Sequence, residues 1–255
     1  MEYTDVQLRE LHLAALASLA LEQQQEEFDR ARRTDNKLSD AERREQADKV
    51  REATSSTYTW LTRYTKTFNP HWKDHGWESP YRAFPNWPFV EPLCEYLEDD
   101  SERVKLIEKS RDMMATWTIA GYFTLQCQLV AEREVIVQTM TDEKGFEVIS
   151  YAKHLYASQP QWLRDAFPLP KPLDKQPASE FRVGTSVMHV IPSGIGKIRS
   201  YHPWGIFSDE TAFQPQAEVA YDEARASGVR KIVLNSTANA GWYYDFTHDA
   251  TMTRA

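Results

Sequence analysis

The sequence predicts an α/β fold in which helices flank a mostly parallel sheet. The chain has 255 residues, of which 41% are apolar and 12% aromatic, so it can bury a sizeable core. From residue 104 onward, short runs typical of strands alternate with longer helical stretches. This alternation favours parallel strands that are joined by helical crossovers. Residues 1–60 differ in character from this part of the chain.

Residues 1–60 are expected to form a helical hairpin ahead of the sheet. Residues 5–33 contain neither glycine nor proline, and they carry leucines at helical spacing, at Leu8, Leu11, Leu16 and Leu19. A second helix is expected from Asp40 to about Ala53, with Ser39 as its N-cap. The mixed charges of this second helix indicate a solvated surface. A docking arm for a partner or a neighbouring subunit is the alternative.

Residues 61–103 are expected to be a connector and residues 104–255 to hold the α/β core. Five prolines between residues 68 and 92 exclude a regular helix there. Pro160 and the prolines of residues 168–177 predict a long loop inside the core. Strands are expected at residues 104–107, 134–140, 186–192, 204–209 and 231–236, and helices at residues 115–131, 142–157 and 215–227.

Composition narrows the class of protein. The formal net charge of −8 argues against a surface that binds nucleic acid throughout, although a local basic track is compatible with it. The two cysteines, Cys94 and Cys127, provide neither a disulfide framework nor a metal-ligand spacing, which suits a reducing compartment. The apolar run at residues 11–21 is too short to span a bilayer, and no signal peptide is recognisable. We therefore expect a soluble intracellular protein.

The segment KSRDMMATW, residues 109–117, follows the first expected strand of the core and opens its first expected helix. Proteins that bind nucleotides place their phosphate loop at such a junction, because free backbone N–H groups and the helix dipole favour an anion there. The two glycines and the lysine of G-x-x-x-x-G-K-[ST] are missing from their usual places. Taken alone, the segment is more often an ordinary strand end that meets a helix.

Two further strand ends carry polar residues suited to phosphate chemistry. The apolar run WGIFSDET ends in Asp209, which could hold Mg²⁺, and Glu210, which could polarise an attacking water. The run KIVLNSTAN ends in Ser236 and Thr237, whose hydroxyls could sense cleavage of a phosphate. An ordinary acidic surface and a simple turn cap are the alternatives.

The three segments occur in the order KSRDMMATW, IRSYHPWGIFSDETAF and KIVLNSTANAGWYYDF. In this order they resemble the ATPase domain of the large terminase subunit of tailed bacteriophages, over roughly residues 80–246. The resemblance implies a sheet of the P-loop NTPase type, an ATPase that uses ATP and Mg²⁺, and a motor that drives viral double-stranded DNA into a procapsid. It also implies sequence-independent contacts to the DNA backbone, a portal protein and a small terminase subunit as partners, and a homo-oligomeric ring when assembled. The expected location is the cytoplasm of the infected bacterial host.

The resemblance assigns roles to the first segment. Lys109 would be the phosphate-binding lysine, moved to the start of the loop, because Ala115 occupies its usual place. Thr116 would supply a hydroxyl to Mg²⁺, and Arg111 would act as an arginine finger in cis. The backbone N–H groups of residues 112–116 would bind the phosphates. The nucleotide-binding set is completed by Ser110, Asp112, Met113, Met114 and Ala115.

The resemblance assigns roles to the other segments as well. Asp209 would bind the metal, and Glu210 would be the catalytic carboxylate. Arg199 is a candidate arginine finger or sensor. The coupling motif would consist of Ser236, Thr237 and Ala238. An aromatic segment upstream would pack on the adenine base, with a hydrophobic strap over the core as the alternative; its residues are Phe84, Pro85 and Trp87.

The chain differs from the family pattern in three respects. The family's glutamine in the adenine-binding segment is absent, with Val90 or Glu91 near its expected place. Met114 and Ala115 replace a glycine and the lysine of the phosphate loop. A nucleotide-binding assembly or docking module without useful turnover on its own is therefore the alternative function. After Phe246 only nine residues remain, too few for the nuclease domain that large terminases carry. Nuclease activity is not expected from this chain.

Overall fold

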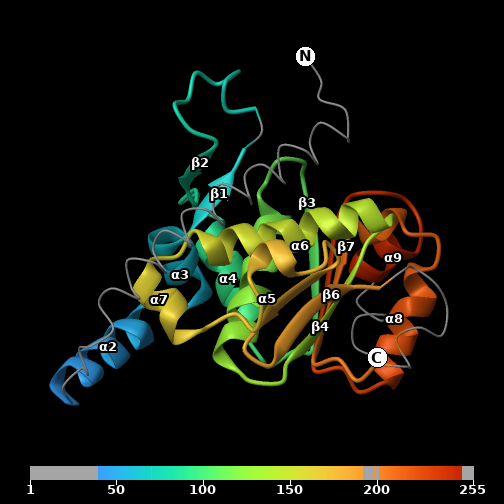
Figure 1. Ribbon diagram of the computed structural model, residues 1–255. Coiled ribbons are helices and arrows are strands. Elements are labelled where there is room, and N and C mark those ends of the chain that lie inside the picture. The colour runs from blue at the N-terminus through green and yellow to red at the C-terminus, as the bar shows by residue number, and fades with distance from the viewer. Residues whose placement is uncertain (1–39, 70, 192–197, 199–200, 249–255) are drawn as a thin grey trace.

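The computed structural model describes residues 40–69, 71–191, 198 and 201–248 (Figure 1). The helix expected from Asp40 is present as α2, Asp40–Ala53. Three sequence predictions lie outside the described residues: the helix within residues 5–33, the N-cap Ser39 of α2, and the candidate Arg199. The division at residues 60 and 103 stays a prediction.

Six strands form one sheet in the order β3-β8-β7-β4-β6-β5. All neighbouring strands run parallel except β5, which pairs antiparallel with β6 at one edge. The expected α/β fold with a mostly parallel sheet is confirmed. The strands are β3 Val104–Lys109, β4 Glu134–Gln138, β5 Glu180–Val183, β6 Ser186–Val190, β7 Gly205–Asp209 and β8 Lys231–Thr237.

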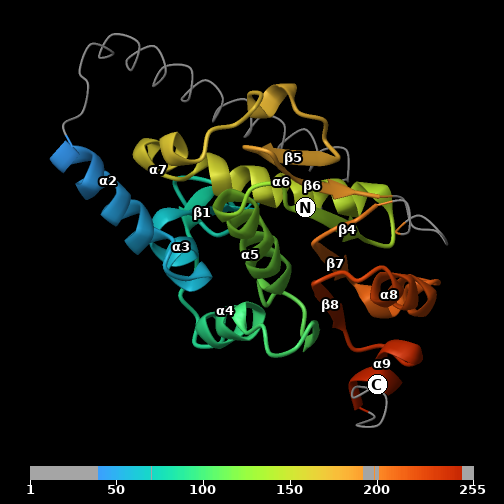
Figure 2. The same cartoon turned by 90° about the horizontal axis from the view of Figure 1, so that it is seen from below.

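Helices cover both faces of this sheet (Figure 2). Helices α5, Ala115–Leu129, and α6, Asp142–Ala157, lie on one face, and α8, Ala217–Ala226, and α9, Trp242–His248, lie on the other. Successive residues of a strand point to opposite faces. In β4, Val135 and Val137 join the core under α5 and α6, whereas Ile136 joins the core under α8 and α9. Burial on both faces explains why the inner strands β4 and β8 carry unbroken apolar runs.

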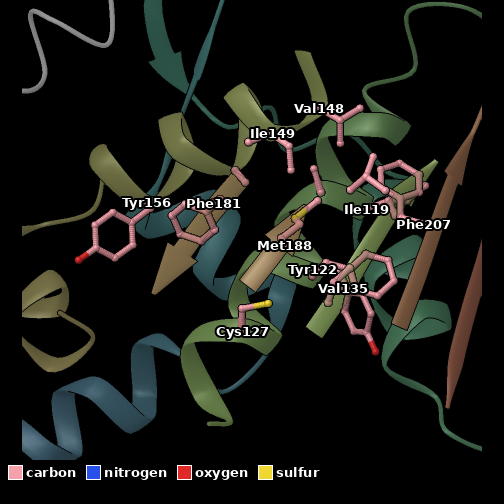
Figure 3. Packing of buried hydrophobic residues seen from close by; sticks show 14 of the residues in the cluster. Ile119, Tyr122, Cys127, Val135, Val148, Ile149, Tyr156, Phe181, Met188 and Phe207 are labelled. Carbon is pink, nitrogen blue, oxygen red and sulfur yellow. The ribbon is translucent and has the colours of Figure 1, made fainter. Parts of the chain in front are cut away.

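The core between the sheet, α5 and α6 fixes where α5 begins. Ile119 and Tyr122 of α5 pack with Ile149 of α6 and with Met188 and Phe207 of the sheet (Figure 3). Full burial of a side chain of this size contributes about 1.5–3 kcal/mol. Because α5 is held along most of its length, its first residues are held at a set place beside the strand ends.

Residues 57–98 pack against α5 and α6. They contain α3, Thr57–Tyr64, the hairpin strands β1, Lys66–Phe68, and β2, Tyr81–Ala83, and helix α4, Val90–Glu98. Glu98 Oε1 accepts hydrogen bonds from the Thr57 backbone N (2.5 Å) and Oγ1 (2.6 Å), which joins the end of α4 to the start of α3. Helix α4 begins inside the expected proline-rich connector. Pro92 lies in its first turn, where a missing N–H leaves no helical bond unmade.

The expected strands and helices of the core are present, with ends that differ by a few residues. The strand expected at residues 134–140, for example, ends at Gln138. Sequence reasoning missed the edge strand β5, in which Phe181 and Val183 alternate with polar residues, because an alternation over only four residues is too short to distinguish a strand from a loop. It also missed helix α9. Two further short helices lie between Pro160 and residue 177, where a long loop was expected: α7, Gln161–Ala166, and the 3₁₀ helix η1, Leu173–Lys175.

The structure describes the two cysteines and allows a search for metal-binding clusters and membrane-spanning helices. Cys94 and Cys127 are both free and buried, and burial raises the pKa of each thiol to about 12. Neither thiol is therefore poised to react at neutral pH. No cluster of three or more metal-binding His, Cys, Asp or Glu side chains occurs among the described residues. Within the same residues, no helix combines the length and the apolar character needed to cross a membrane.

The contact between α6 and β6 yields a stability prediction. A Cβ atom on Gly145 would lie 2.6 and 2.8 Å from the two methyl carbons of Val190, a β-branched side chain with little freedom to turn away. We expect Gly145→Ala to lower the free energy of unfolding by about 1–3 kcal/mol, although alanine is the better helix former. Urea denaturation measures this change.

Gly121→Ala in α5 is the matched control. The nearest atom to its added Cβ would be Cδ2 of Leu61, at 2.6 Å, the far end of a side chain that can adjust. We expect a smaller loss than for Gly145→Ala. Equal losses at the two positions would contradict the close-approach account.

Candidate functional site

The candidate site lies where β3, β7 and β8 end. These strands are parallel neighbours in the sheet, so their carboxyl ends meet at one edge. In the register of β3 and β8, Lys109 is paired with Thr237, and in that of β7 and β8, Asp209 is paired with Asn235. The three segments singled out in the sequence are thus brought together at a single place.

The loop after β3 has the backbone of an anion-binding turn. Asp112 (φ 60°) and Met114 (φ 52°) are both left-handed, and Met114 is the residue that precedes α5. The backbone N–H groups of residues 112–116 donate to no acceptor in the described part of the chain. No acidic residue occupies the first turn of α5. The positive end of the helix dipole and these N–H groups are therefore available to a phosphate.

Lys109 and Glu210 form an ion pair across the end of β8. Lys109 Nζ lies 2.7 Å from Glu210 Oε1, and the lysine side chain is only 12% exposed. The other carboxylate oxygen, Glu210 Oε2, accepts from the Thr237 backbone N (3.2 Å) and Oγ1 (3.0 Å). Burial acts to raise the pKa of Glu210, but the bonds from Lys109 and Thr237 outweigh it and hold that pKa below its ordinary value. Glu210 is therefore ionised at neutral pH.

Asp209 is the buried carboxylate of the pair. Thr116 Oγ1 lies 3.2 Å from both of its oxygens, and Asn235 Nδ2 donates to Oδ1 at 2.6 Å. Burial raises the pKa of Asp209 to about 6, although the hydrogen bond from Asn235 and the charge of Lys109 act to lower it. The two adjacent acids thus have pKa values shifted in opposite directions, which is common where acids have different chemical roles.

A hydrogen-bonded turn holds Glu210 in its position. Glu210 is left-handed, with φ 51°, and it precedes the 3₁₀ helix η3, Thr211–Phe213. Thr211 Oγ1 lies 2.9 Å from Ser208 Oγ, and Gln214 Nε2 donates to the Asp209 carbonyl oxygen at 2.8 Å. Ser236 Oγ accepts from the Ala212 backbone N at 3.1 Å. The turn is tied to both β7 and β8, which offsets the cost of the left-handed residue.

The residues around Asp209 fit a divalent cation. The Thr116 hydroxyl and the Asp209 carboxylate are hard oxygen donors that lie within 3.2 Å of one another, as expected of two groups that share one Mg²⁺ shell. Asn235 Oδ1 is a buried acceptor that has no hydrogen-bond partner among the described residues. With few protein oxygens, such a site suits Mg²⁺, which keeps several waters and is completed by substrate phosphates.

The remaining expected site residues surround this centre. Ser110, Arg111 and Asp112 are exposed, Met113 and Met114 are half-buried, and Ala115 is buried. Arg111 forms no ion pair within the described part of the chain, so its side chain is not brought to the acids. Ser236 is buried beside Glu210, and Ala238 is exposed just beyond it.

The aromatic segment reaches the phosphate-loop end of α5. Phe84 is 3% exposed and belongs to a core cluster that includes Trp117, with Met114 packed against it. Trp87 is 41% exposed, and Pro85 is half-buried. Phe84 therefore acts as a hydrophobic strap, whereas Trp87 has a ring surface open to a ligand. Their contact with a base stays a prediction.

Sequence reasoning missed several residues of the site. Asn235 directly follows the apolar run Ile232–Leu234 and precedes Ser236, so in the sequence it has the appearance of an ordinary polar residue at a strand end. Trp117 of α5 stacks on Tyr151 of α6, with ring centroids 4.1 Å apart, and Tyr151 Oη donates to Glu147 Oε1 at 2.5 Å. These residues lie far apart in the sequence and share no motif, so only the fold places them beside the phosphate loop.

Comparison with solved structures gives the fold a counterpart. The chain is similar to the large terminase of bacteriophage HK97, with a TM-score of 0.50 and 13% sequence identity over 73% of this chain. The chain shares its fold with part of that large terminase. The match covers 38% of the HK97 protein, so this chain spans well under half of its length.

Two structures of the large terminase ATPase domain of Thermus phage P74-26 are also similar. Their TM-scores are 0.44 and 0.43, with 10% and 9% identity, and each match covers 71% of this chain and 74% of the phage domain. No protein-family model matches the chain, and no curated protein matches it. At such low identity the likeness to a large terminase concerns the fold, and roles of individual residues depend on the geometry described above.

The raised pKa of Asp209 predicts a pH dependence of stability. The pKa is 3.8 in the unfolded chain and about 6 in the folded protein, so folding favours the protonated form. This contribution is fully present below the unfolded pKa and is lost as the pH rises through the folded pKa. A shift of this size corresponds to about 3 kcal/mol.

Asp209→Asn, which cannot titrate, is the reference for this measurement. Chemical denaturation with a chelator present would give the unfolding free energy of both proteins from about pH 4 to about pH 7. We expect the parent to lose up to about 3 kcal/mol relative to Asp209→Asn over this window. A difference that stays constant over this window would contradict the raised pKa of Asp209.

Proposed function

We propose that this chain is an ATPase module of a DNA-packaging motor, which uses ATP and Mg²⁺ to drive viral double-stranded DNA into a procapsid. One observation carries the proposal. A lysine, a hydroxyl and two carboxylates from two segments far apart in the sequence meet at the carboxyl ends of β3 and β7, next to a helix N-terminus and across the end of β8, which lies between these strands. This is the set of groups that phosphoryl transfer from ATP to water requires.

The phosphates of ATP would bind at the start of α5. Backbone N–H groups of residues 112–116 and the helix dipole would attract them. Lys109 stands at the start of this loop, and its flexible side chain can turn from Glu210 to a phosphate oxygen. Thr116 and Asp209 would hold Mg²⁺, which neutralises charge on the phosphate oxygens when bound. Arg111, exposed on the same loop, would add a guanidinium as charge develops on the transferred group.

Glu210 would orient and deprotonate the attacking water. Its Oε1 is freed when Lys109 turns to the phosphate, while Oε2 stays on Thr237, so the carboxylate keeps its place. An ionised carboxylate in a fixed position is what a general base needs. Ser236, Thr237 and Ala238 would pass the change in Glu210 to the rest of the motor.

The partners follow from the resemblance to large terminases. We propose double-stranded DNA, contacted through its backbone so that any sequence is accepted, together with a portal protein and a small terminase subunit. The working form would be a ring of identical subunits in the cytoplasm of the infected bacterial host, with Arg199 as a further arginine finger or sensor. Trp87, with Phe84 and Pro85 behind it, would contact the adenine base.

Steady-state hydrolysis of ATP tests this function. We expect Mg²⁺-dependent turnover by the parent and a loss of at least about 100-fold in Lys109→Ala and Glu210→Gln, because each variant removes a group that acts on the transferred phosphate or on the water. Lys49→Ala is the matched control. It breaks an exposed Lys–Glu ion pair of the same 2.7 Å length, Lys49 with Glu45 in α2, and we expect turnover to be unchanged.

Nucleotide binding by the same proteins separates the two candidate functions. Binding of ATP without turnover by the parent would favour the docking module that does not hydrolyse ATP on its own. Absence of both binding and turnover would overturn the proposal.

A further inference from the structure

The end of β8 holds both carboxylates of the candidate site. Asn235 donates to Asp209, and the next two residues, Ser236 and Thr237, lie against Glu210 at 3.5 and 3.0 Å. The proposed function assigns Ser236 and Thr237 to the coupling segment, but it gives Asn235 no role.

Asn235 is an unusual choice for its position. It is 0% exposed, and the three residues before it, Ile232, Val233 and Leu234, are apolar and buried. An amide in such surroundings loses its water and needs hydrogen bonds in return. Its Nδ2 has one at 2.6 Å, to Asp209, but its Oδ1 has no partner among the described residues. A residue kept only for packing would be better replaced by leucine, which has a similar size.

The bond from Asn235 reaches a particular oxygen of Asp209. Thr116 Oγ1 is equally far, 3.2 Å, from both oxygens of the carboxylate, so it does not distinguish one from the other. Asn235 Nδ2 does, because it binds Oδ1 alone. The amide therefore fixes the rotation of the carboxylate about its Cβ–Cγ bond. It leaves Oδ2, which also lies beside the threonine hydroxyl, as the carboxylate oxygen that accepts no hydrogen bond from the amide.

We infer that Asn235 is a positioning residue for the metal ligand Asp209: its amide holds the carboxylate so that Oδ2 faces the same Mg²⁺ as the Thr116 hydroxyl. This inference rests on the proposed function, in which Asp209 and Thr116 hold the metal. Hydrogen-bond partners of metal ligands act in this way in general, and their loss typically weakens metal binding 10–100-fold. Because Asn235 and Thr237 lie on the same strand end, the metal ligand and the water-activating carboxylate keep a fixed relation to each other.

Direct metal binding tests the inference without relying on turnover. Mn²⁺ is the probe, and its electron paramagnetic resonance signal distinguishes free from bound ion in the absence of nucleotide. We expect Asn235→Leu, which keeps the branched shape but not the amide, to raise the dissociation constant for Mn²⁺ by about 10–100-fold. Asn235→Ser is the second variant, in case the leucine variant does not fold, and the same direction is expected.

A second measurement separates positioning from a general loss of structure. In the ATPase assay, the Mg²⁺ concentration for half-maximal turnover is expected to rise by a similar factor, with the rate restored at saturating Mg²⁺. Binding of ADP without metal is expected to stay unchanged. Asn239→Ser is the matched control, because Asn239 is an exposed asparagine on the same segment that donates to the Ala212 carbonyl at 3.2 Å.

The results distinguish failure of the inference from failure of the proposed function. If the parent binds Mn²⁺ and folded Asn235→Leu or Asn235→Ser binds it within twofold of the parent, Asn235 is not a positioning residue. If excess Mg²⁺ does not restore turnover, its role is structural. A parent that binds no Mn²⁺, either alone or with a non-hydrolysable ATP analogue present, overturns the metal site itself, and the inference with it.

Discussion

The constraint on which the site depends is the place of β8 between β3 and β7. Lys109 leaves the sheet from β3, and Asp209 and Glu210 leave it from β7, so the ion pair between Lys109 and Glu210 must cross the end of β8. The polar side chains at that end are consequently close to both acids. Had β3 and β7 been direct neighbours, no strand would lie between the lysine and the carboxylates to hold them.

Backbone strain is concentrated where this constraint is strongest. Of the four non-glycine residues with positive φ among those described, Asp112, Met114 and Glu210 belong to the site, and Glu132 lies in a turn elsewhere. A left-handed residue with a side chain costs roughly 1–2 kcal/mol. The cost is offset by packing of Met114 against the core cluster that contains Phe84 and Trp117, and by the hydrogen-bonded turn after Glu210. Conformations of this kind persist where surrounding contacts over-determine them, as is typical of functional sites.

The sequence predicted most of the fold and part of the site, for reasons visible in single residues. Asp209 and Glu210 could be found because an unbroken apolar run ends in them, and parallel topology then required that they meet Lys109. Asn235 could not be assigned, because its importance comes from a neighbour 26 positions away in the sequence. Phe84 was assigned a ligand contact but lies in the core. The sequence could not decide this, because an aromatic residue in a loop has the same sequence pattern in both cases.

The pairing of charges suggests how the site would communicate with the rest of the fold. Every ionised group at the centre has a partner in this state, so a phosphate that draws Lys109 away must change the environment of Glu210. Glu210 keeps its second contact, to Thr237, and the change is therefore felt at the end of β8. Slightly below that end, Tyr243 Oη of α9 lies 2.8 Å from the Ile107 carbonyl oxygen of β3 and 3.2 Å from that of Leu234 in β8. Because this one buried hydroxyl contacts both strands, a shift of β8 relative to β3 must also move or strain α9, on the face of the sheet opposite to α5.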